Sequence, residues 1–585
     1  MQLSIHLPRE RYLVFWDRLR GGSAGLLALA VAIGAGASLG AVGFRWLVVA
    51  ATELFSGWSD YTAHVGAAHR LLPWAGRWFV VAAPVAAGLL YGPLIQLGAR
   101  EARGHGVPEV MYAVTVHGGR IRPRVAMVKS LASALCIGGG GSVGREGPIV
   151  QVGSALASAA GQLLRLPDSR LRLLVAAGAA GAVSATFNAP IAAVFFALEL
   201  ILADFAVESF AAVVLASVTS SAISRALLGD HPFLALPTFH VVSPVEYLWY
   251  GALGLLAAVV GVGFSRMLYL IEDACDRCWR GPEWLRPAVG GLLLGGVLLA
   301  LPELYGVGYP VLDRAVAGNY SVVFLLVLLI GKMLAASLTI GIGGSGGVFG
   351  PTLFIGAMLG AAVGDAAHSV MPGLAAPPGA YALVGMGAVF AGAARTPITA
   401  VVMIFELTGE YSVVLPLMVA VALAAGASRL LSADTIYTRK LHRRGIDLGR
   451  DHRPAPTVDT VARALPAALP AQASLDEVAQ RFAAGGHDAL PVVDDHGRLR
   501  GVVPAVEVER ALRDHASDVT AADLASGVPV LRAGQSLDEA LDAVVRAGGL
   551  GVPVQREDTL VGWITHRDIL AAVTRDRRPG RTDGQ

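Results

Sequence analysis

The chain has 585 residues, of which 54% are hydrophobic, only 15% are charged and 71 are glycine. This apolar, glycine-rich composition is typical of closely packed transmembrane helices, in which small residues let backbones approach. The net charge of +2 is too small to indicate a nucleic acid or an acidic substrate as a partner. The three cysteines include one lone pair, Cys275-x-x-Cys278, so we expect no metal site and no required cofactor.

Residues 1–20 contain four arginines and are expected to form a cytoplasmic N-terminal helix: Arg9, Arg11, Arg18 and Arg20. Apolar segments then follow from about residue 24 to 431, and several are shorter than the roughly 20 residues that span a bilayer. Such segments indicate broken helices whose unwound backbone faces protein or a wet cavity. A second basic cluster, from Arg439 to Arg444, follows the last segment. By the positive-inside rule both termini are cytoplasmic, which predicts an integral multi-pass protein of a bacterial inner (plasma) membrane.

Two interruptions of the apolar sequence share one skeleton. They are Gly141-Ser142-Val143-Gly144-Arg145-Glu146-Gly147-Pro148 and Gly344-Ser345-Gly346-Gly347-Val348-Phe349-Gly350-Pro351. Each ends in a proline, which suits the first turn of a helix. A helix start presents unpaired N–H donors and the positive end of the helix dipole, so the expected cargo is an anion. One such break in each half indicates a transporter binding site, and Glu146 in the first copy suggests a gate.

A second internal match supports two related halves, about 77–227 and 287–431. It pairs Pro190, Ala193 and Glu199 with Pro397, Ala400 and Glu406. An inverted relation would bring both breaks together at mid-membrane. We therefore expect a mainly α, multi-span membrane protein of two inverted repeats with broken helices. The two paired glutamates are expected to cap or brace facing helices rather than to carry protons.

Four motifs, in order along the chain, resemble those of the CLC family of chloride channels and proton-coupled chloride antiporters. They are Gly104-His105-Gly106-Val107-Pro108, Gly144-Arg145-Glu146-Gly147-Pro148, Gly347-Val348-Phe349-Gly350-Pro351 and the tyrosine of Ile436-Tyr437-Thr438. The resemblance covers about residues 20–445. It implies a membrane domain over 21–445 that moves chloride and forms a homodimer with one pore in each subunit.

The resemblance also implies a set of anion-binding residues: His105, Gly106, Arg145, Gly147, Val348, Phe349 and Tyr437. Backbone N–H groups of Val348 and Phe349 can hold a dehydrated anion without a full positive charge, as conduction through weak sites requires. The Tyr437 hydroxyl adds a neutral donor. Glu146 is the expected gating glutamate, whose carboxylate can occupy an anion's place and is released by protonation. Lys129 lies in an apolar stretch and is expected either to tune the pore electrostatically or to snorkel.

Two residues depart from the family pattern. His105 stands where the family usually has a serine whose hydroxyl points at the central anion; its ring could donate a hydrogen bond or turn aside, which leaves anion selectivity open. Leu200 stands where proton-coupled antiporters often carry an inner glutamate, next to Glu199. Leucine cannot relay a proton, which favours a channel-like, voltage- or pH-gated chloride pathway. A proton-coupled chloride antiporter is the alternative.

Beyond about residue 450 the pattern becomes α/β, which predicts a linker (446–459), two similar units (460–516 and 517–578) and a disordered tail (579–585). Ser474-Leu475-Asp476-Glu477 recurs as Ser536-Leu537-Asp538-Glu539, and neither unit could bury its apolar face well alone. The region resembles a cytoplasmic tandem CBS pair. In the second unit Thr565 and Asp568 match the adenine-nucleotide motif, whereas the first unit has Pro504 in place of the hydroxyl. The alternative is a tail that binds nothing and only stabilises a dimer.

Other classes of function fit the sequence less well. An intramembrane metalloprotease would need a histidine pair such as H-E-x-x-H, which is missing, and no enzymatic activity is expected. A CBS-regulated cation carrier would need acidic residues at mid-membrane, whereas the breaks offer N–H donors and one carboxylate. Gly139-x-Gly141-x-x-Gly144 matches a dinucleotide fingerprint only formally, because no strand precedes it and no ribose-binding acid follows.

Overall fold

The computed structural model describes residues 23–229, 242–446, 457–485, 487–515, 518–556 and 559–576. The chain divides into two compact units, Met1–Asp447 and Leu448–Gln585. The predicted N-terminal helix of residues 1–20 and the predicted tail of residues 579–585 lie outside the described residues, as does most of the predicted linker.

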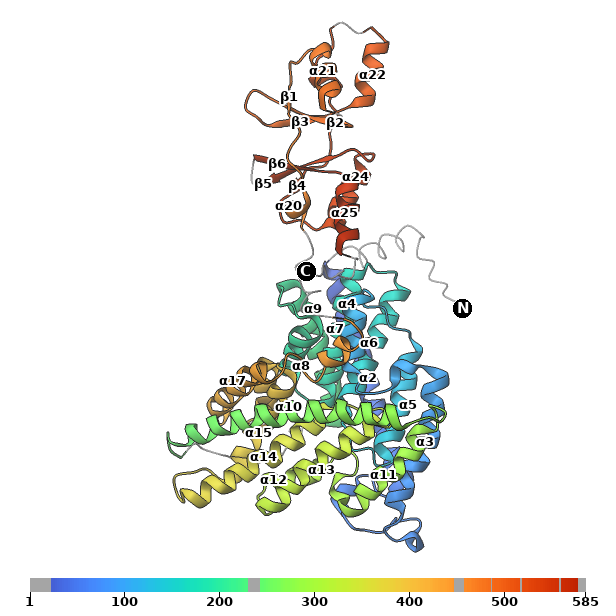
Figure 1. Ribbon diagram of the computed structural model, residues 1–585, viewed down its shortest axis with the longest axis vertical. Helices are drawn as coiled ribbons and strands as arrows, with labels where there is room; N and C mark the ends of the chain where they lie inside the picture. The colour runs from blue at the N-terminus through green and yellow to red at the C-terminus, as the bar shows by residue number, and fades with distance from the viewer. Residues whose placement is uncertain are drawn as a thin grey trace, which may run out of the picture. The chain divides into compact units, whose positions relative to one another are not determined.

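In its described residues the first unit is helical and runs through the same order of long and short helices twice (Figure 1). The first series comprises α2 (Ser23–Ser56), α3 (Phe79–Gly98), α4 (Val107–Val116), α5 (Arg124–Gly138), α6 (Glu146–Leu163), α7 (Asp168–Phe187), α8 (Pro190–Phe196) with its π-helical continuation η4 (Ala197–Leu202), and α9 (Val207–Leu228). The second comprises α10 (Glu246–Cys278), α11 (Arg286–Ala300), α12 (Tyr309–Val316), α13 (Val322–Gly341), α14 (Phe349–Val370), α15 (Pro378–Ala394), α16 (Pro397–Thr408) and α17 (Val414–Leu431), and α18 (Thr438–His442) follows. Short 3₁₀ helices lie in the connections: η1 (Tyr61–His64), η2 (Pro73–Ala75), η3 (Arg100–Ala102) and η5 (Pro302–Leu304). The correspondence includes α2 and α10, which precede the two halves expected from the sequence.

Among the described residues, eight helices are long and apolar enough to cross a membrane. Shorter apolar helices such as α4, α11 and α16 lie between them. The structure is therefore a mainly α, multi-span membrane protein with broken helices, as predicted.

The two helices that follow the glycine-rich breaks are packed in the same way in both halves. In the first half, a Cβ on Gly153 of α6 would lie 2.4 Å from the Gly178 carbonyl oxygen of α7, and the reverse distance is also 2.4 Å. In the second half, Gly356 of α14 and Gly385 of α15 meet in the same reciprocal manner, at 2.3 Å each. No side chain fits at these crossings. The glycines therefore let α6 pack closely against α7, and α14 against α15, which positions the helices that follow the breaks.

The two halves also cap each other's helices. The Glu406 carboxylate of α16 accepts hydrogen bonds from the N–H groups of Ile191 (2.9 Å) and Ala192 (2.7 Å) at the start of α8. In return, the Glu199 carboxylate accepts from the Thr399 N–H (2.9 Å) and hydroxyl (2.7 Å) at the start of α16. Both glutamates therefore satisfy N–H groups that a helix start leaves open, which is the capping role expected from the sequence.

The second unit contains two three-stranded sheets of the same topology. In each, the first strand is parallel to the second and the second antiparallel to the third, with Leu469 opposite Val492 in one sheet and Leu531 opposite Val554 in the other. The strands are β1 (Leu469–Pro470), β2 (Ala489–Val493), β3 (Leu499–Pro504), β4 (Leu531–Arg532), β5 (Val552–Arg556) and β6 (Thr559–Ile564). The helices are α20 (Val458–Val461), α21 (Leu475–Gly485), α22 (Ala505–Arg513), α23 (Ala521–Leu524), α24 (Leu537–Arg546) and α25 (His566–Asp576). The order of helix, strand, turn, strand and helix is thus present twice, in agreement with the two similar α/β units expected from the sequence.

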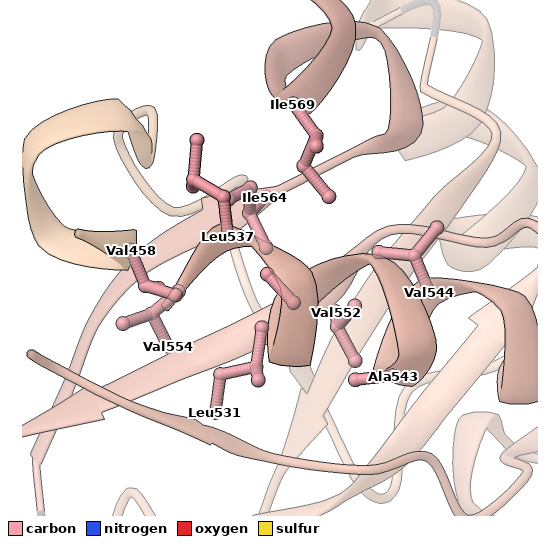
Figure 2. Packing of buried hydrophobic residues seen from close by; sticks show 10 residues of the cluster. Val458, Leu531, Leu537, Ala543, Val544, Val552, Val554, Ile564 and Ile569 are labelled. Atoms are coloured by element: carbon pink, nitrogen blue, oxygen red, sulfur yellow. The ribbon is translucent and has the colours of Figure 1, made fainter. Parts of the chain in front are cut away.

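Each sheet has its own core, and the two sheets are joined. Figure 2 shows the core of the second sheet, in which Val458 from α20 lies among residues from β4 to α25. Ala489, Val502 and Trp563 form a smaller apolar cluster between the sheets, as expected for units that cannot bury their faces alone. The chain also crosses between them, because Arg463 pairs with Trp563 of β6 whereas Ser526 pairs with Val502 of β3.

We predict that Ile564→Ala destabilises the second unit by about 2–5 kcal/mol, because it removes a fully buried side chain from this core. Urea denaturation of residues 448–585, followed by circular dichroism, measures the change. Val561→Ala is the matched control on the same strand, since Val561 is 44% exposed and its loss should cost less than about 0.5 kcal/mol. Equal unfolding midpoints for the two variants would contradict the assignment of the core.

Candidate functional site

The two glycine-rich breaks meet each other directly. The Gly144 N–H donates to the Gly347 carbonyl at 2.8 Å, and the Gly347 N–H donates to the Gly144 carbonyl at 2.6 Å. A Cβ on Gly347 would lie only 2.6 Å from the Gly147 nitrogen. Two unwound segments from different halves therefore satisfy each other's polar groups, which backbone at membrane depth requires. The prediction that the breaks come together is confirmed.

The first motif packs against the second break. The Gly104 N–H donates to the Gly344 carbonyl at 3.0 Å, and the Lys129 ammonium donates to the carbonyls of Ala102 (2.9 Å) and Gly104 (2.7 Å). Lys129 is fully buried, so it does not snorkel. Its side-chain nitrogen lies directly behind the loop that carries His105 and Gly106.

The same arrangement exists in the second half, for which the sequence motifs gave no prediction. Lys332 lies at the same offset before its break as Lys129 does, and it is also fully buried. Its ammonium donates to the carbonyls of Gly306 (2.9 Å) and Val307 (3.0 Å). These belong to Gly306-Val307-Gly308-Tyr309-Pro310, which copies the skeleton of Gly104-His105-Gly106-Val107-Pro108. The repeated Gly-x-Gly-x-Pro was the signal that could have revealed this loop.

Glu146 is held in place by groups from the second half. It begins α6 and is only 2% exposed. The Tyr309 hydroxyl donates to Oε1 at 2.5 Å, and the Gly350 N–H at the start of α14 donates to Oε2 at 3.2 Å. The carboxylate thus occupies a place where N–H and O–H donors converge, which is the kind of place that an anion would take. This contact of Tyr309 with Glu146 was not predicted from the sequence.

Several of the predicted residues line one cavity of about 10 Å³. Glu146, Gly147, Phe349 and Tyr437 border it, and Val107 borders it from the first motif. The remaining lining is apolar: Val150, Val183, Phe187 and Phe196. A cavity of this size has room for about one particle the size of a water molecule. Its apolar walls strengthen electrostatic interactions inside it.

His105 carries buried polar atoms without hydrogen-bond partners. It is fully buried, and within the described part of the chain neither ring nitrogen has a hydrogen-bond partner. Its ring centroid lies 6.4 Å from that of Tyr437, which lines the cavity, and 6.3 Å from that of Tyr269. A neutral imidazole has one N–H and one lone pair to place, so buried nitrogens without partners indicate a missing ligand or water.

The remaining predicted anion-binding residues lie at different places. Val348 precedes α14 and is 1% exposed. Gly106 has a φ of +84°, and a Cβ there would lie 2.7 Å from the Gly147 carbonyl oxygen, so only glycine fits. Arg145 is not among the residues that line the cavity of Glu146. Its guanidinium lies over the Tyr309 ring at 5.1 Å, and it borders two other cavities, one of them with Arg45.

A larger cavity of about 220 Å³ lies beside Gly104 of the first motif. It is lined by four cations, Arg100, Arg103, Lys440 and Arg444, and by three acids, Glu109, Glu272 and Asp276. Glu109 is already occupied, since it pairs with Arg444 at 2.7 Å and with Lys440 at 3.8 Å. The lining thus has one more basic than acidic side chain, and three of its basic residues are paired with its acids.

In the second unit the two predicted nucleotide residues contact each other. The Thr565 hydroxyl donates to Asp568 Oδ2 at 2.6 Å, and the Thr565 N–H donates to the same oxygen at 3.0 Å. The other oxygen of Asp568 pairs with the Arg463 guanidinium. A nucleotide ribose would therefore have to compete with Arg463 for this carboxylate.

The membrane unit matches a family model described as voltage gated chloride channel over residues 87–429, which is more than half of the chain. The chain belongs to this family, the CLC family. The CBS domain model matches residues 461–514 and 518–575. The CLC chain thus carries a tandem CBS pair after its membrane unit, as predicted.

Some curated relatives of this CLC chain are named as chloride channels and others as proton/chloride exchange transporters. A putative chloride channel protein ClcB-like from Ralstonia nicotianae is 35% identical over 72% of this chain and 97% of its own length. The H(+)/Cl(-) exchange transporter ClcA from Vibrio parahaemolyticus is 35% identical over 60% of this chain and 76% of its own length. The transporter of the same name from Vibrio vulnificus is 33% identical over 72% of this chain and 89% of its own length.

Solved structures share the fold. A slow cyanobacterial Cl-/H+ antiporter superposes with a TM-score of 0.63 at 24% identity, over 72% of this chain and 97% of its own. A eukaryotic CLC transporter superposes with a TM-score of 0.60 at 23% identity, over 95% of this chain and 98% of its own. The CLC architecture therefore extends over the whole membrane unit.

We predict that Gly147→Ala abolishes chloride flux and lowers the thermal stability of the protein. The added Cβ would lie 2.1 Å from the His105 carbonyl oxygen and 2.9 Å from the Gly347 Cα, so the paired breaks must separate, at a cost of about 1–3 kcal/mol. Gly43→Ala on α2 is the control, because nothing lies within 4 Å of its Cβ position. Thermal unfolding in detergent and chloride efflux from liposomes measure both effects. Wild-type behaviour of Gly147→Ala would contradict the close packing of the site.

Proposed function

We propose that the protein exchanges chloride for protons across a membrane, through one pore in each subunit of a homodimer. The observation that carries this proposal is the position of Glu146, whose carboxylate is bound by an N–H and an O–H donor beside a small cavity. An ionisable group in such a place can compete with the anion and can also carry a proton. The names of the Vibrio relatives support exchange over a channel.

The chemistry follows from the charge on this carboxylate. When ionised, Glu146 occupies the donors and excludes a second anion. When protonated, it is neutral, its hold on these donors weakens, and a chloride ion can replace it. Release of the proton on the other side restores the charged form and expels the anion. The ionised carboxylate and chloride thus alternate at one place. The two movements are opposite when chloride enters from the side to which the proton is released and leaves toward the side from which the proton came.

The anion would be held mainly by neutral donors, so that it can also leave. We assign this role to the N–H groups of Val348 and Phe349 at the start of α14 and to the Tyr437 hydroxyl. Gly106 and Gly147 allow the backbone to approach without side chains. Lys129 supplies a buried positive charge behind the first motif. Arg145, which borders a cavity with Arg45, would attract anions to the pathway rather than bind them in the cavity of Glu146.

His105 is proposed to be the side-chain donor of the central anion site. Its unpartnered ring nitrogens favour a ring that donates to a passing anion over one that turns aside to a protein partner. An imidazole N–H reaches further than the serine hydroxyl usual in the family. The anion preference of this chain should therefore depend on His105.

A chloride channel is the second candidate, because of Leu200. This residue is buried in the π-helical turn η4, and its neighbour Glu199 caps α16. Neither side chain offers a free inner carboxylate for a proton relay. Exchange by this chain therefore requires a proton route through water or through other side chains.

The proposal extends to the membrane, the domain boundaries and the ligand of the CBS pair. We infer a bacterial inner membrane with both termini cytoplasmic, and a membrane domain of residues 21–445 joined by a linker to CBS units at 460–516 and 517–578. Adenine nucleotide is the proposed ligand of the CBS pair, at Thr565 and Asp568. Its binding would release Arg463 from Asp568.

Replacing Glu146 tests exchange and gate together. Liposomes are loaded with chloride and diluted into chloride-free buffer of the same pH, with valinomycin and K⁺ to dissipate charge. The outward chloride gradient should then drive protons inward through the wild type. Glu146→Gln should abolish this proton movement and remove the pH dependence of chloride flux, because glutamine cannot ionise. Exposed Glu53→Gln on α2 should leave both unchanged. Chloride flux without proton movement in the wild type would support the channel, and an unaltered Glu146→Gln would exclude the gate.

Replacing His105 tests the anion site. His105→Ala should weaken chloride binding about five- to tenfold, as expected for one lost hydrogen bond to an ion. His105→Ser should retain affinity but change the relative fluxes of chloride, bromide and nitrate. Isothermal titration and liposome fluxes measure these effects, with exposed His117→Ala as control. Wild-type affinity and selectivity in both His105 variants would show that the ring does not contact the anion.

A further inference from the structure

The second half contributes a hydroxyl to the gate from a loop that copies the first anion motif. Gly306-Val307-Gly308-Tyr309-Pro310 leads into α12, just as Gly104-His105-Gly106-Val107-Pro108 leads into α4. Gly308 and Gly106 both have positive φ, at +90° and +84°. The same backbone turn thus brings Val107 to the cavity in one half and Tyr309 to Glu146 in the other.

The contact between Tyr309 and Glu146 is short and involves the charged group itself. At 2.5 Å the hydroxyl lies in the range of O–H donors to ionised carboxylates, and such bonds are stronger than those between neutral groups. The other side-chain oxygen of Glu146 has the longer 3.2 Å bond from the Gly350 N–H. Of these two contacts, the hydroxyl is therefore the stronger hold on the carboxylate.

We propose that Tyr309 is a latch that holds ionised Glu146 in the pathway and sets the pH at which the gate opens. Tyr309 is a positioning residue, because it acts on the anion only through Glu146. The inference rests on the proposed function, in which protonation releases this carboxylate.

The direction of the effect follows from hydrogen bonding. A donor that binds the carboxylate stabilises the ionised form over the protonated form. Without the Tyr309 hydroxyl, only the Gly350 N–H of these two donors still binds the Glu146 carboxylate. Protonation of Glu146 then becomes easier. Release should then begin at higher pH, and at neutral pH more pores should be open.

Several other charged or titratable groups lie near the gate. Arg145 precedes Glu146 on its own segment, and Arg45 of α2 borders a cavity with Arg145. Lys332 of α13 acts on Glu146 electrostatically, and Tyr437 lines the same cavity. The Tyr309 side chain also hydrogen-bonds to Arg145, and Tyr309→Phe removes that contact as well, while the phenylalanine ring can still pack under the guanidinium.

The experiment is chloride efflux from liposomes between pH 4 and 8. Tyr309→Phe should move the midpoint of activation to higher pH by about one unit or more, which corresponds to the loss of one hydrogen bond to a charged group. The matched control is Tyr305→Phe, which removes a buried hydroxyl that donates to the Gly138 carbonyl at 2.6 Å and not to Glu146. Its midpoint should equal that of the wild type.

A double variant separates a latch from a structural role. In Glu146→Gln the charged partner is gone, so adding Tyr309→Phe should cause no further change. An unshifted midpoint in Tyr309→Phe, or a uniform loss of flux at every pH, would overturn the latch.

If Tyr309→Phe does not give a monodisperse protein, Tyr309→His is the substitute. Its ring is too short to bring a donor to the same point, so it should shift the midpoint in the same direction. Absence of chloride flux in the wild type, or pH-dependent flux in Glu146→Gln, would instead contradict the proposed function.

Discussion

Two hydrogen bonds between Gly144 and Gly347 are the interaction on which the rest of the membrane unit depends. They join two unwound segments that come from different halves, and they satisfy backbone groups that could not face lipid. Because they fix the starts of α6 and α14 next to each other, both helix dipoles point into the same small space. The glycines at this contact leave no room for a side chain, so the position of the site is set by backbone before any functional side chain is considered.

The halves share a backbone plan but differ in the side chains that it carries. Lys129 and Lys332 hold equivalent loops through equivalent carbonyls. At the helix starts that follow the breaks, one half presents Glu146 and the other Phe349. At the preceding loops one half presents His105, and the other presents Tyr309 two positions later. In the proposed function, this repeated backbone therefore carries a titratable gate in one half and anion-binding groups in the other.

The sequence was sufficient for features that repeat locally. The skeleton of the breaks, the paired Glu199 and Glu406, and the duplicated tail units all follow from short patterns, and the structure contains each of them. The contact between Tyr309 and Glu146 was not predictable, because it joins residues of different halves and depends on the side-chain direction after a turn. The same holds for Arg145 over Tyr309 and for Arg463 on Asp568. Leu200 favoured a channel when considered alone, whereas the names of the relatives favour exchange.

The reciprocal caps of α8 and α16 have a consequence for biogenesis. A ribosome delivers the first half to the membrane well before the second, and during that interval the N–H groups of Ile191 and Ala192 have no Glu406 to bind them. The early half must keep the start of α8 near water, or near the insertion machinery, until α16 arrives. When it does, both helix starts are satisfied in one step, because Glu199 meets Thr399 in the same contact. Neither cap can therefore form until both halves are present.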